Sequence, residues 1–233
     1  MATKNPLLSV IVPTLNEEKY LEHTLKSIKN QDYRGKYEII VVDSNSKDKT
    51  VKIARKYADK VLISSKRNSS SQRNLGAKKA KGNILAFLDA DTIVDKHWVK
   101  SIFQIMSKED IVGVTGSFYP LENIKGKYLY SLANNFQRIL IKLKYPLFNG
   151  ASCAFKKDVF LKIGGFDENL KMSEDHDISL RMVKYGKMVF NSEMIAFTSA
   201  RRFLKDRNGA LFFYINDILD YFVLRKFKRY KIL

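Results

Sequence analysis

The amino-acid sequence predicts an α/β protein with a mostly parallel sheet flanked by helices. Short runs rich in valine and isoleucine alternate with longer amphipathic segments through the first half of the chain, and the short runs have the length and composition of strands. This alternation builds parallel strands joined by right-handed helical crossovers. The 233 residues, 45% of them hydrophobic, are enough for the core of one large domain, which we expect at residues 1–205.

Four strands are expected in the first half, at residues 7–13, 37–43, 60–64 and 83–89. In a parallel sheet, ligands bind at the carboxyl ends of the strands. Polar residues follow three of these strands, at residues 13–18, 43–50 and 89–91. We therefore expect the three loops to share one edge of the sheet and to hold the functional site.

Three amphipathic helices are expected between the strands, at residues 16–31, 46–58 and 69–82. The second has Ser46 or Asp48 as a candidate N-cap, and the third is expected to end at Gly82. Gly76, inside the third helix, permits close packing of that helix on its neighbours.

The second half of the chain is less regular. Residues 125–148 predict an aromatic helix or a partly ordered flap, residues 156–166 a short helix stopped by two glycines, and residues 174–186 a helix with an acidic start. The tail, residues 206–233, is expected to form a basic amphipathic helix. Its last residues include Arg225, Lys226, Lys228, Arg229 and Lys231.

The composition limits the classes of partner and compartment. With 42 Lys and Arg against 24 Asp and Glu, the net charge is +18, which favours phosphate-bearing partners or a solvated basic surface. The single cysteine, Cys153, excludes an internal disulfide framework, and we expect it to be an inert buried thiol. No run approaches the roughly 20 apolar residues of a spanning helix, and no signal peptide is recognisable, so a cytoplasmic location is expected, either free or held at a membrane surface.

Asp89 and Asp91 follow the fourth strand. The two residues are two positions apart, so on an extended backbone their side chains point the same way. Their carboxylates therefore repel each other unless a cation lies between them. Mg²⁺ or Mn²⁺ is the cation that such oxygen ligands select, and diphosphate oxygens would complete its coordination. A solvated turn or a helix cap is the alternative role for these two residues.

Four ordered segments together resemble family 2 glycosyltransferases of the GT-A fold. They are residues 9–50 ("SVIVPTLNEE…DSNSKDKT"), 71–91 ("SQRNLG…FLDAD"), 164–182 ("GGFDENLKMSEDHDISLRM") and 198–203 ("TSARRF"). The resemblance implies a nucleotide-binding half at about residues 1–118 and an acceptor-binding half at about 119–205. It also implies a metal-dependent, inverting transferase that uses a nucleotide-diphosphate sugar.

The resemblance also assigns candidate residues to the donor. The residues implied at the nucleotide are Pro13, Thr14, Asn16, Glu17, Asp43, Ser44, Arg73, Asn74, Asp89 and Ala90. Asp43 would accept a hydrogen bond from the base, and Ser44 stands where many members have a second aspartate, which leaves UDP and GDP both open. The guanidinium of Arg73 can bind a phosphate through two parallel hydrogen bonds, although a helix-surface charge is the alternative.

A second acidic cluster, Glu174, Asp175 and Asp177, begins the helix at residue 174, where helix capping is one role for carboxylates. The resemblance implies that Asp175 is the general base and that Glu174 shares this work or orients the acceptor. His176, inside the same cluster, is a candidate ligand or proton carrier, but we expect it to have a surface role or a role behind the reacting groups. Arg181 is expected to hold the cluster by ion pairing.

The remaining candidates lie on the acceptor side. The resemblance implies that Asn149, Gly150, Arg201 and Arg202 face the diphosphate or the acceptor, and that Asp91 with Asp89 holds the metal. Members of the family often have a late histidine as a further metal ligand, and the sequence offers no clear equivalent.

The acceptor is expected to be a saccharide or a lipid-linked molecule such as a polyprenyl phosphate. The tail and the aromatic stretch 128–148 either touch the membrane or pack on their own domain. The rival functions are a nucleotidyltransferase, an inactive nucleotide-sugar-binding protein, a glycoside hydrolase and a basic nucleic-acid-binding module. The last gives the acidic strand ends no purpose, so no nucleic-acid partner is expected.

Overall fold

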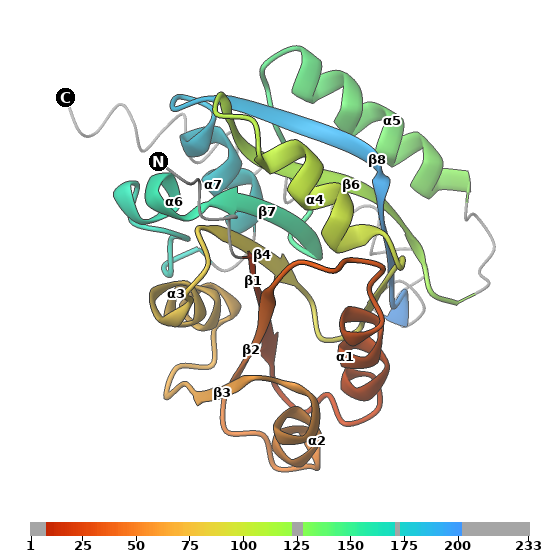
Figure 1. Cartoon of the computed structure of the whole chain (residues 1–233), viewed down its shortest axis with the longest axis vertical. Helices are drawn as coiled ribbons and strands as arrows, with labels where there is room; N and C mark the ends of the chain where they lie inside the picture. Colours follow the sequence, from red (N-terminus) through yellow and green to blue (C-terminus); the bar gives the residue numbers. More distant parts are fainter. Residues whose placement is uncertain (1–7, 123–127, 171–172, 202–233) are drawn as a thin grey trace.

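The computed structural model describes residues 8–122, 128–170 and 173–201 (Figure 1). The strands are β1 Leu8–Thr14, β2 Tyr37–Asp43, β3 Lys60–Ile63, β4 Ile84–Leu88, β5 Thr92–Val94, β6 Ile111–Pro120, β7 Ser152–Lys156 and β8 Lys187–Thr198. The helices are α1 Leu21–Lys29, α2 Thr50–Tyr57, α3 Ser69–Lys79, α4 Trp98–Met106, α5 Tyr128–Lys142, α6 Lys157–Lys162 and α7 Glu174–Met182.

The strands form one eight-stranded sheet in the order β3-β2-β1-β4-β7-β6-β8-β5. Strand β1 is parallel to β2 and to β4, and β2 is parallel to β3. Strand β7 runs antiparallel to both β4 and β6. The register pairs Thr14 with Asp43, so the ends of β1 and β2 lie side by side. The prediction of a mostly parallel sheet with the polar loops at one edge is confirmed.

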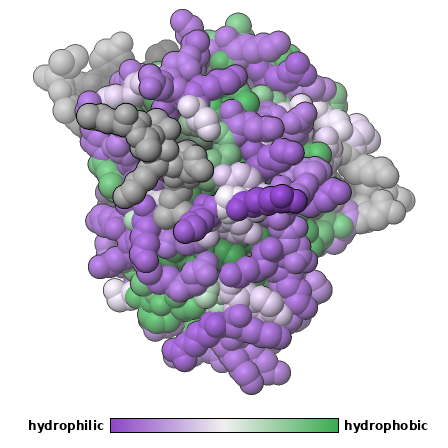
Figure 2. Space-filling model, in the orientation of Figure 1, coloured by the Kyte–Doolittle hydropathy of each residue, from purple (hydrophilic) through white to green (hydrophobic). Residues whose placement is uncertain are grey.

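Helices cover both faces of this sheet, and the strands bury side chains on each face. Val10 and Val12 pack in one hydrophobic cluster with α1 and α4, whereas Ile11, between them, packs in a second cluster with α3, α6 and α7. Two-sided burial requires a continuous apolar run, which is why β1, β2 and β4 could be recognised from sequence, whereas β3 is a half-buried edge strand. Figure 2 shows that hydrophilic side chains cover most of the visible outer surface, with smaller hydrophobic patches between them.

Local details correct parts of the helix predictions. Helix α3 ends at Lys79 with an extended Ala80, not at Gly82. The N-cap of α2 is Lys49, so neither Ser46 nor Asp48 occupies that position, although the Asp48 carboxylate accepts a hydrogen bond from the Thr50 backbone N–H at 2.9 Å.

The close approach predicted for Gly76 is confirmed. An added Cβ at this position would lie 2.5 Å from Ile11 Cγ2, so any side chain would push α3 off the sheet.

In the second half, the predicted segments are helices. Residues 128–142 form α5, and α6 is stopped by Gly164 and Gly165, which have φ of 85° and 71°. The strands β5 to β8 and helix α4 were not predicted. No helix in the described ranges is long and apolar enough to cross a membrane. The predicted tail, residues 206–233, lies outside the described residues.

Candidate active site

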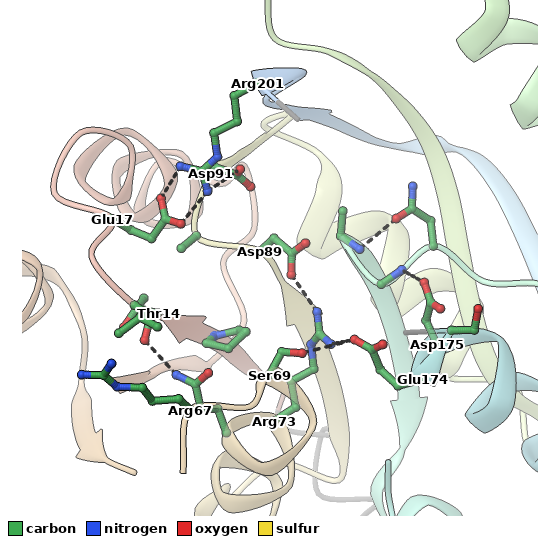
Figure 3. Close-up of a pocket in the computed structure, with 18 of the residues that line it drawn as sticks. Thr14, Glu17, Arg67, Ser69, Arg73, Asp89, Asp91, Glu174, Asp175 and Arg201 are labelled. Atoms are coloured by element: carbon green, nitrogen blue, oxygen red, sulfur yellow. Dashed lines mark hydrogen bonds and ion pairs between the residues drawn. The ribbon is translucent and has the colours of Figure 1, made fainter. Parts of the chain in front are cut away.

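Two of the three predicted loops, those that follow β1 and β4, line a cavity of about 520 Å³, whereas no residue of the loop at 43–50 lines it (Figure 3). The start of α7 and residues 149–151 form the opposite wall. The lining residues are Pro13, Thr14, Leu15, Glu17, Arg67, Ser69, Gln72, Arg73, Asp89, Ala90, Asp91, Asn149, Gly150, Ala151, Ser173, Glu174, Asp175, His176 and Arg201. The cavity thus brings together residues that lie far apart in the sequence, including both acidic clusters.

Asp43 does not line the cavity, but it contacts Thr14, which does. It is fully buried, and its carboxylate accepts hydrogen bonds from Thr14 Oγ1 at 3.0 Å and from the Ser46 backbone N–H at 2.8 Å. Ser44 is also buried, and its hydroxyl donates to the Lys66 carbonyl at 2.7 Å. Asp43 and Ser44 therefore tie together the loops that follow β1, β2 and β3.

Asn16 and Asn74, two other candidates for the nucleotide, have structural contacts outside the cavity lining. Asn16 is exposed at φ 55°, and its side chain accepts from the Lys47 N–H at 2.8 Å. Asn74 is buried, donates to the Phe166 carbonyl at 2.9 Å and accepts from the Phe166 N–H at 2.9 Å. The first joins two loops at the sheet edge, and the second fixes the segment that leads toward α7.

Arg73 connects the two acidic clusters. Its guanidinium donates to Asp89 Oδ1 and to Glu174 Oε1, each at 2.8 Å, and its side chain is 4% exposed (Figure 3). Burial alone would lower the pKa of Arg73, but the carboxylates of Asp89 and Glu174 outweigh it and hold that pKa above its ordinary value. The alternative of a helix-surface charge for Arg73 is wrong.

Arg201 makes the second set of ion pairs in the cavity, with Glu17 and Asp91. Its guanidinium lies 3.0 Å from Asp91 Oδ2 and donates to Glu17 Oε2 at 2.9 Å (Figure 3). The hydrogen bond to Glu17 raises the pKa of Arg201, against the smaller opposing effect of burial. Glu122 supports this position, because it accepts from the backbone N–H of Ala200 at 2.6 Å.

Asp175 points into the cavity from the start of α7. Its Oδ2 accepts from the Gly150 N–H at 2.7 Å, and its Oδ1 accepts from the His176 backbone N–H at 2.9 Å. Burial raises the pKa of Asp175, and the neighbouring charge of Glu174 adds to this, while His176, Gly150 and Arg73 oppose it. A carboxylate with a raised pKa is a better proton acceptor than an exposed one.

The three acidic residues of α7 have different partners. Glu174 faces Arg73, Asp175 faces the cavity, and Asp177 is fully buried, where Arg181 Nε donates to it at 2.8 Å. The ion-pairing role predicted for Arg181 is confirmed. His176 is 5% exposed and lines the cavity beside Asp175, so a surface role for it is wrong.

The donor set fits a hard divalent cation that shares its coordination with phosphates. Asp89 and Asp91 both line the cavity, and Mg²⁺ is often held by one or two carboxylates plus substrate phosphates. Within the part of the chain that the structure describes, no group of three or more His, Cys, Asp or Glu residues is arranged to hold a metal. The pair therefore fits a metal that arrives with a diphosphate, and Arg73 and Arg201 neutralise the two carboxylates in this structure.

Sequence reasoning missed three cavity residues that follow β3, namely Arg67, Ser69 and Gln72. Gln72 Nε2 donates to the carbonyls of Thr14 and Val42, at 2.8 and 2.6 Å, and so connects α3 to the ends of β1 and β2. The signal was available, because the polar run 64–72 also follows a parallel strand. Arg202, a predicted diphosphate contact, lies outside the described residues.

The sequence pattern of Glycosyl transferase family 2 matches residues 9–164. The chain is 31% identical over 206 residues to an uncharacterized glycosyltransferase of Rickettsia typhi, covering 83% of this chain and 64% of that protein. It is 29% identical over 214 residues to the glycosyltransferase AglE of Haloferax volcanii, covering 87% of this chain and 70% of that protein. The chain therefore spans less than two thirds of the length of the Rickettsia relative.

Two solved structures share the fold. One is the mannosyltransferase PcManGT from Pyrobaculum calidifontis in complex with GDP-Man and Mn²⁺, with a TM-score of 0.68 and 23% identity, covering 85% of this chain and 58% of that chain. The other is S. aureus TarS 1–349 in complex with UDP-GlcNAc, with a TM-score of 0.67 and 21% identity, covering 82% and 58%. The similarity confirms the predicted GT-A-like fold.

Proposed function

Because this chain belongs to glycosyl transferase family 2, we propose that it transfers a sugar from a nucleoside-diphosphate sugar to an oxygen of an acceptor, with inversion at the anomeric carbon. The observation that carries the proposal is a single cavity with a carboxylate pair and two arginines on one side and the buried carboxylate of Asp175 on the other. Such a cavity can hold a diphosphate at one end and a nucleophilic hydroxyl at the other.

The donor end is formed by Pro13, Thr14 and Glu17 at the end of β1, by Arg73 on α3 and by Asp89 directly after β4. A donor diphosphate would compete with Asp89 for the guanidinium of Arg73, which is already oriented and largely shielded from water. Titratable partners on both sides keep Arg73 charged, so it would stabilise the negative charge that grows on the leaving group. The nucleobase of the donor is uracil or guanine, so the donor is a UDP-sugar or a GDP-sugar.

A divalent cation, Mg²⁺ or Mn²⁺, would be held by Asp91 with help from Asp89. When bound, it supplies Lewis-acid stabilisation of the departing diphosphate. Arg201 would then give up its contact with Asp91 and keep its contact with Glu17, ready to contribute positive charge beside the diphosphate.

Asp175 would take the proton from the acceptor hydroxyl. The acceptor oxygen forms a bond to the anomeric carbon while the bond from that carbon to the diphosphate oxygen breaks, and the nucleoside diphosphate leaves with the electron pair. The cavity offers one base, Asp175, and no nucleophile is required of the protein. The acceptor oxygen therefore attacks the anomeric carbon once, from the face opposite the departing diphosphate, and the configuration at that carbon is inverted. Glu174 would orient the acceptor or share the proton transfer.

The acceptor end is bounded by Asn149 and Gly150. We propose a saccharide or a lipid-linked molecule, attacking through a hydroxyl or a phosphate oxygen. The charge of +18 supports an anionic acceptor.

The test is calorimetric titration of UDP and GDP with Mn²⁺ and with chelator, for the wild-type chain and for Asp91→Asn. Asp110→Asn is the matched control, because Asp110 pairs with Lys187 on the surface and does not line the cavity. Metal-dependent binding of one nucleotide that is lost in Asp91→Asn and kept in Asp110→Asn supports the donor site. Absence of binding by both nucleotides would refute it.

Release of nucleoside diphosphate from the donor sugar, with water as acceptor, then tests the base. Asp175→Asn should bind the nucleotide normally and lose turnover. Normal turnover in this variant would remove Asp175 from the role of base.

A further inference from the structure

Helix α5 carries most of its large apolar residues on the outside of the protein, although Ile141 near its end is buried in the core. Tyr128, Leu132, Phe136, Ile139 and Leu143 are 66, 59, 59, 54 and 70% exposed. The spacing of four, four and three residues places the first four on one stripe of the helix, and Leu143 follows directly after the helix ends at Lys142. The helix lies at the rim of the molecule beside β8 (Figure 1). This is the reverse of the usual surface helix, which turns its apolar stripe inward.

Buried amides fix this orientation. Asn134 is 6% exposed, accepts from the Phe118 N–H at 3.1 Å and donates to the Phe118 carbonyl at 3.0 Å. Gln137 is 7% exposed and donates to the Leu147 carbonyl at 2.6 Å. Turning the helix to bury its stripe would break these hydrogen bonds, which is costly for buried polar groups. The outward stripe is therefore a specified feature of the fold.

The charge around the stripe indicates what covers it. Between residues 128 and 148 the sequence has three cations, Arg138, Lys142 and Lys144, and no acidic residue. All three cations are exposed. A second copy of a chain with a net charge of +18 would bring like charges together at this face, and the chain's own tail also ends in a basic cluster. An apolar stripe flanked by cations complements a surface that is apolar inside and anionic outside.

We propose that α5 is a membrane-docking helix, which lies in the plane of an anionic lipid surface with its stripe among the acyl chains. A helix of 15 residues is too short to span a bilayer, but its length is ample for binding in the interface. The partner is the lipid surface itself, so this proposal does not depend on the transferase activity.

Docking would also bring the acceptor end of the cavity near the lipid. Gln137 holds Leu147, and the next residues of the chain, Asn149 and Gly150, line the cavity. A lipid-linked acceptor could then enter from the surface to which α5 is bound. This consequence, unlike the docking itself, rests on the proposed function.

The test uses the full chain and a fluorescent label. Cys153 is fully buried, so a cysteine introduced by Phe136→Cys can be labelled selectively with an environment-sensitive fluorophore. We expect a blue shift on vesicles of phosphatidylglycerol and phosphatidylcholine in equal parts, and a much smaller shift on phosphatidylcholine alone. The matched control is Ile63→Cys, since Ile63 is 51% exposed on β3, and its label should not shift.

A second variant keeps the test independent of the label. The variant Leu132→Ser/Phe136→Ser/Ile139→Ser should bind the same vesicles at least about tenfold more weakly than the wild type in a sedimentation assay, with an unchanged melting temperature. The control variant Ile63→Ser/Leu161→Ser/Tyr185→Ser changes equally exposed positions elsewhere and should bind as the wild type does.

Three outcomes would overturn the proposal. A label at residue 136 that is already buried in solution and unmoved by vesicles would mean that the chain's own segment or a second copy covers α5. Equal shifts at residues 136 and 63 would mean unspecific adsorption through the basic surface. Unchanged vesicle binding by the triple α5 variant would place the lipid contact elsewhere.

Discussion

Replacing Arg73 by methionine should destabilise the protein more than any substitution of an exposed cation. The change removes two charge-assisted hydrogen bonds of 2.8 Å and leaves the carboxylates of Asp89 and Glu174 without the cation that they share. Breaking a buried pair costs about 3–5 kcal/mol. Since the side chain of Asp89 is 35% exposed and regains water, we expect the lower part of this range, about 3 kcal/mol.

For a domain of this size, a loss of about 3 kcal/mol lowers the melting temperature by roughly 6–12 °C. Urea denaturation followed by circular dichroism gives the free energy of unfolding, and a thermal melt gives the midpoint. Arg55→Met is the matched control, because Arg55 is exposed on α2, and its effect should stay within about 0.5 kcal/mol.

The double variant Arg73→Met/Glu174→Gln separates the ion pairs from simple packing. Removing one of the two stranded carboxylates should restore part of the lost stability, because less uncompensated negative charge remains. If Arg73→Met lowers the free energy of unfolding by less than about 1 kcal/mol, the electrostatic account of Arg73 is wrong.

Three further predictions follow from the same contacts. Gly165→Ala should cost about 1–3 kcal/mol of unfolding free energy, because Gly165 has φ 71° and an added Cβ would lie 2.4 Å from Asn74 Oδ1; a change below about 0.5 kcal/mol in urea denaturation would contradict this. Gly150→Ala should lower turnover roughly tenfold with little change in nucleotide affinity, since its Cβ would lie 3.1 Å from Asp175 Oδ2; a weaker affinity at unchanged turnover would argue against it. The pKa of Asp175 is raised, so Asp175 becomes protonated and stops acting as a base as the pH falls through that raised value. The acid limb of the pH profile of turnover should therefore lie above about pH 4, the ordinary range for an aspartate. An acid limb at or below that pH would refute the role of Asp175 as the base.

The sequence by itself determined the parallel half of the sheet. Strands buried on both faces must be apolar without interruption, as in residues 84–88, and the polar residues that follow must lie at the carboxyl edge. For the same reason, the cavity could be predicted to contain Thr14, Asp89 and Asp91. Strand β7 is buried along most of its length, but its sequence mixes small, polar and apolar residues, so it was not recognised. Strand β8, which is parallel to β6 and antiparallel to β5, was missed because its burial is uneven and its sequence pattern is mixed.

Only the tertiary structure decided which charges meet. Arg73 and Glu174 are 101 residues apart in sequence, and Arg201 and Glu17 are 184 apart, so no local pattern could pair them. The periodicity of α5 predicts an amphipathic helix, but the partners of Asn134 in β6 decide that its apolar side faces outward. Local sequence fixes the elements through burial and backbone preference, whereas long-range hydrogen bonds and ion pairs, formed only when the elements pack, decide the orientation of helices and the charge of the site.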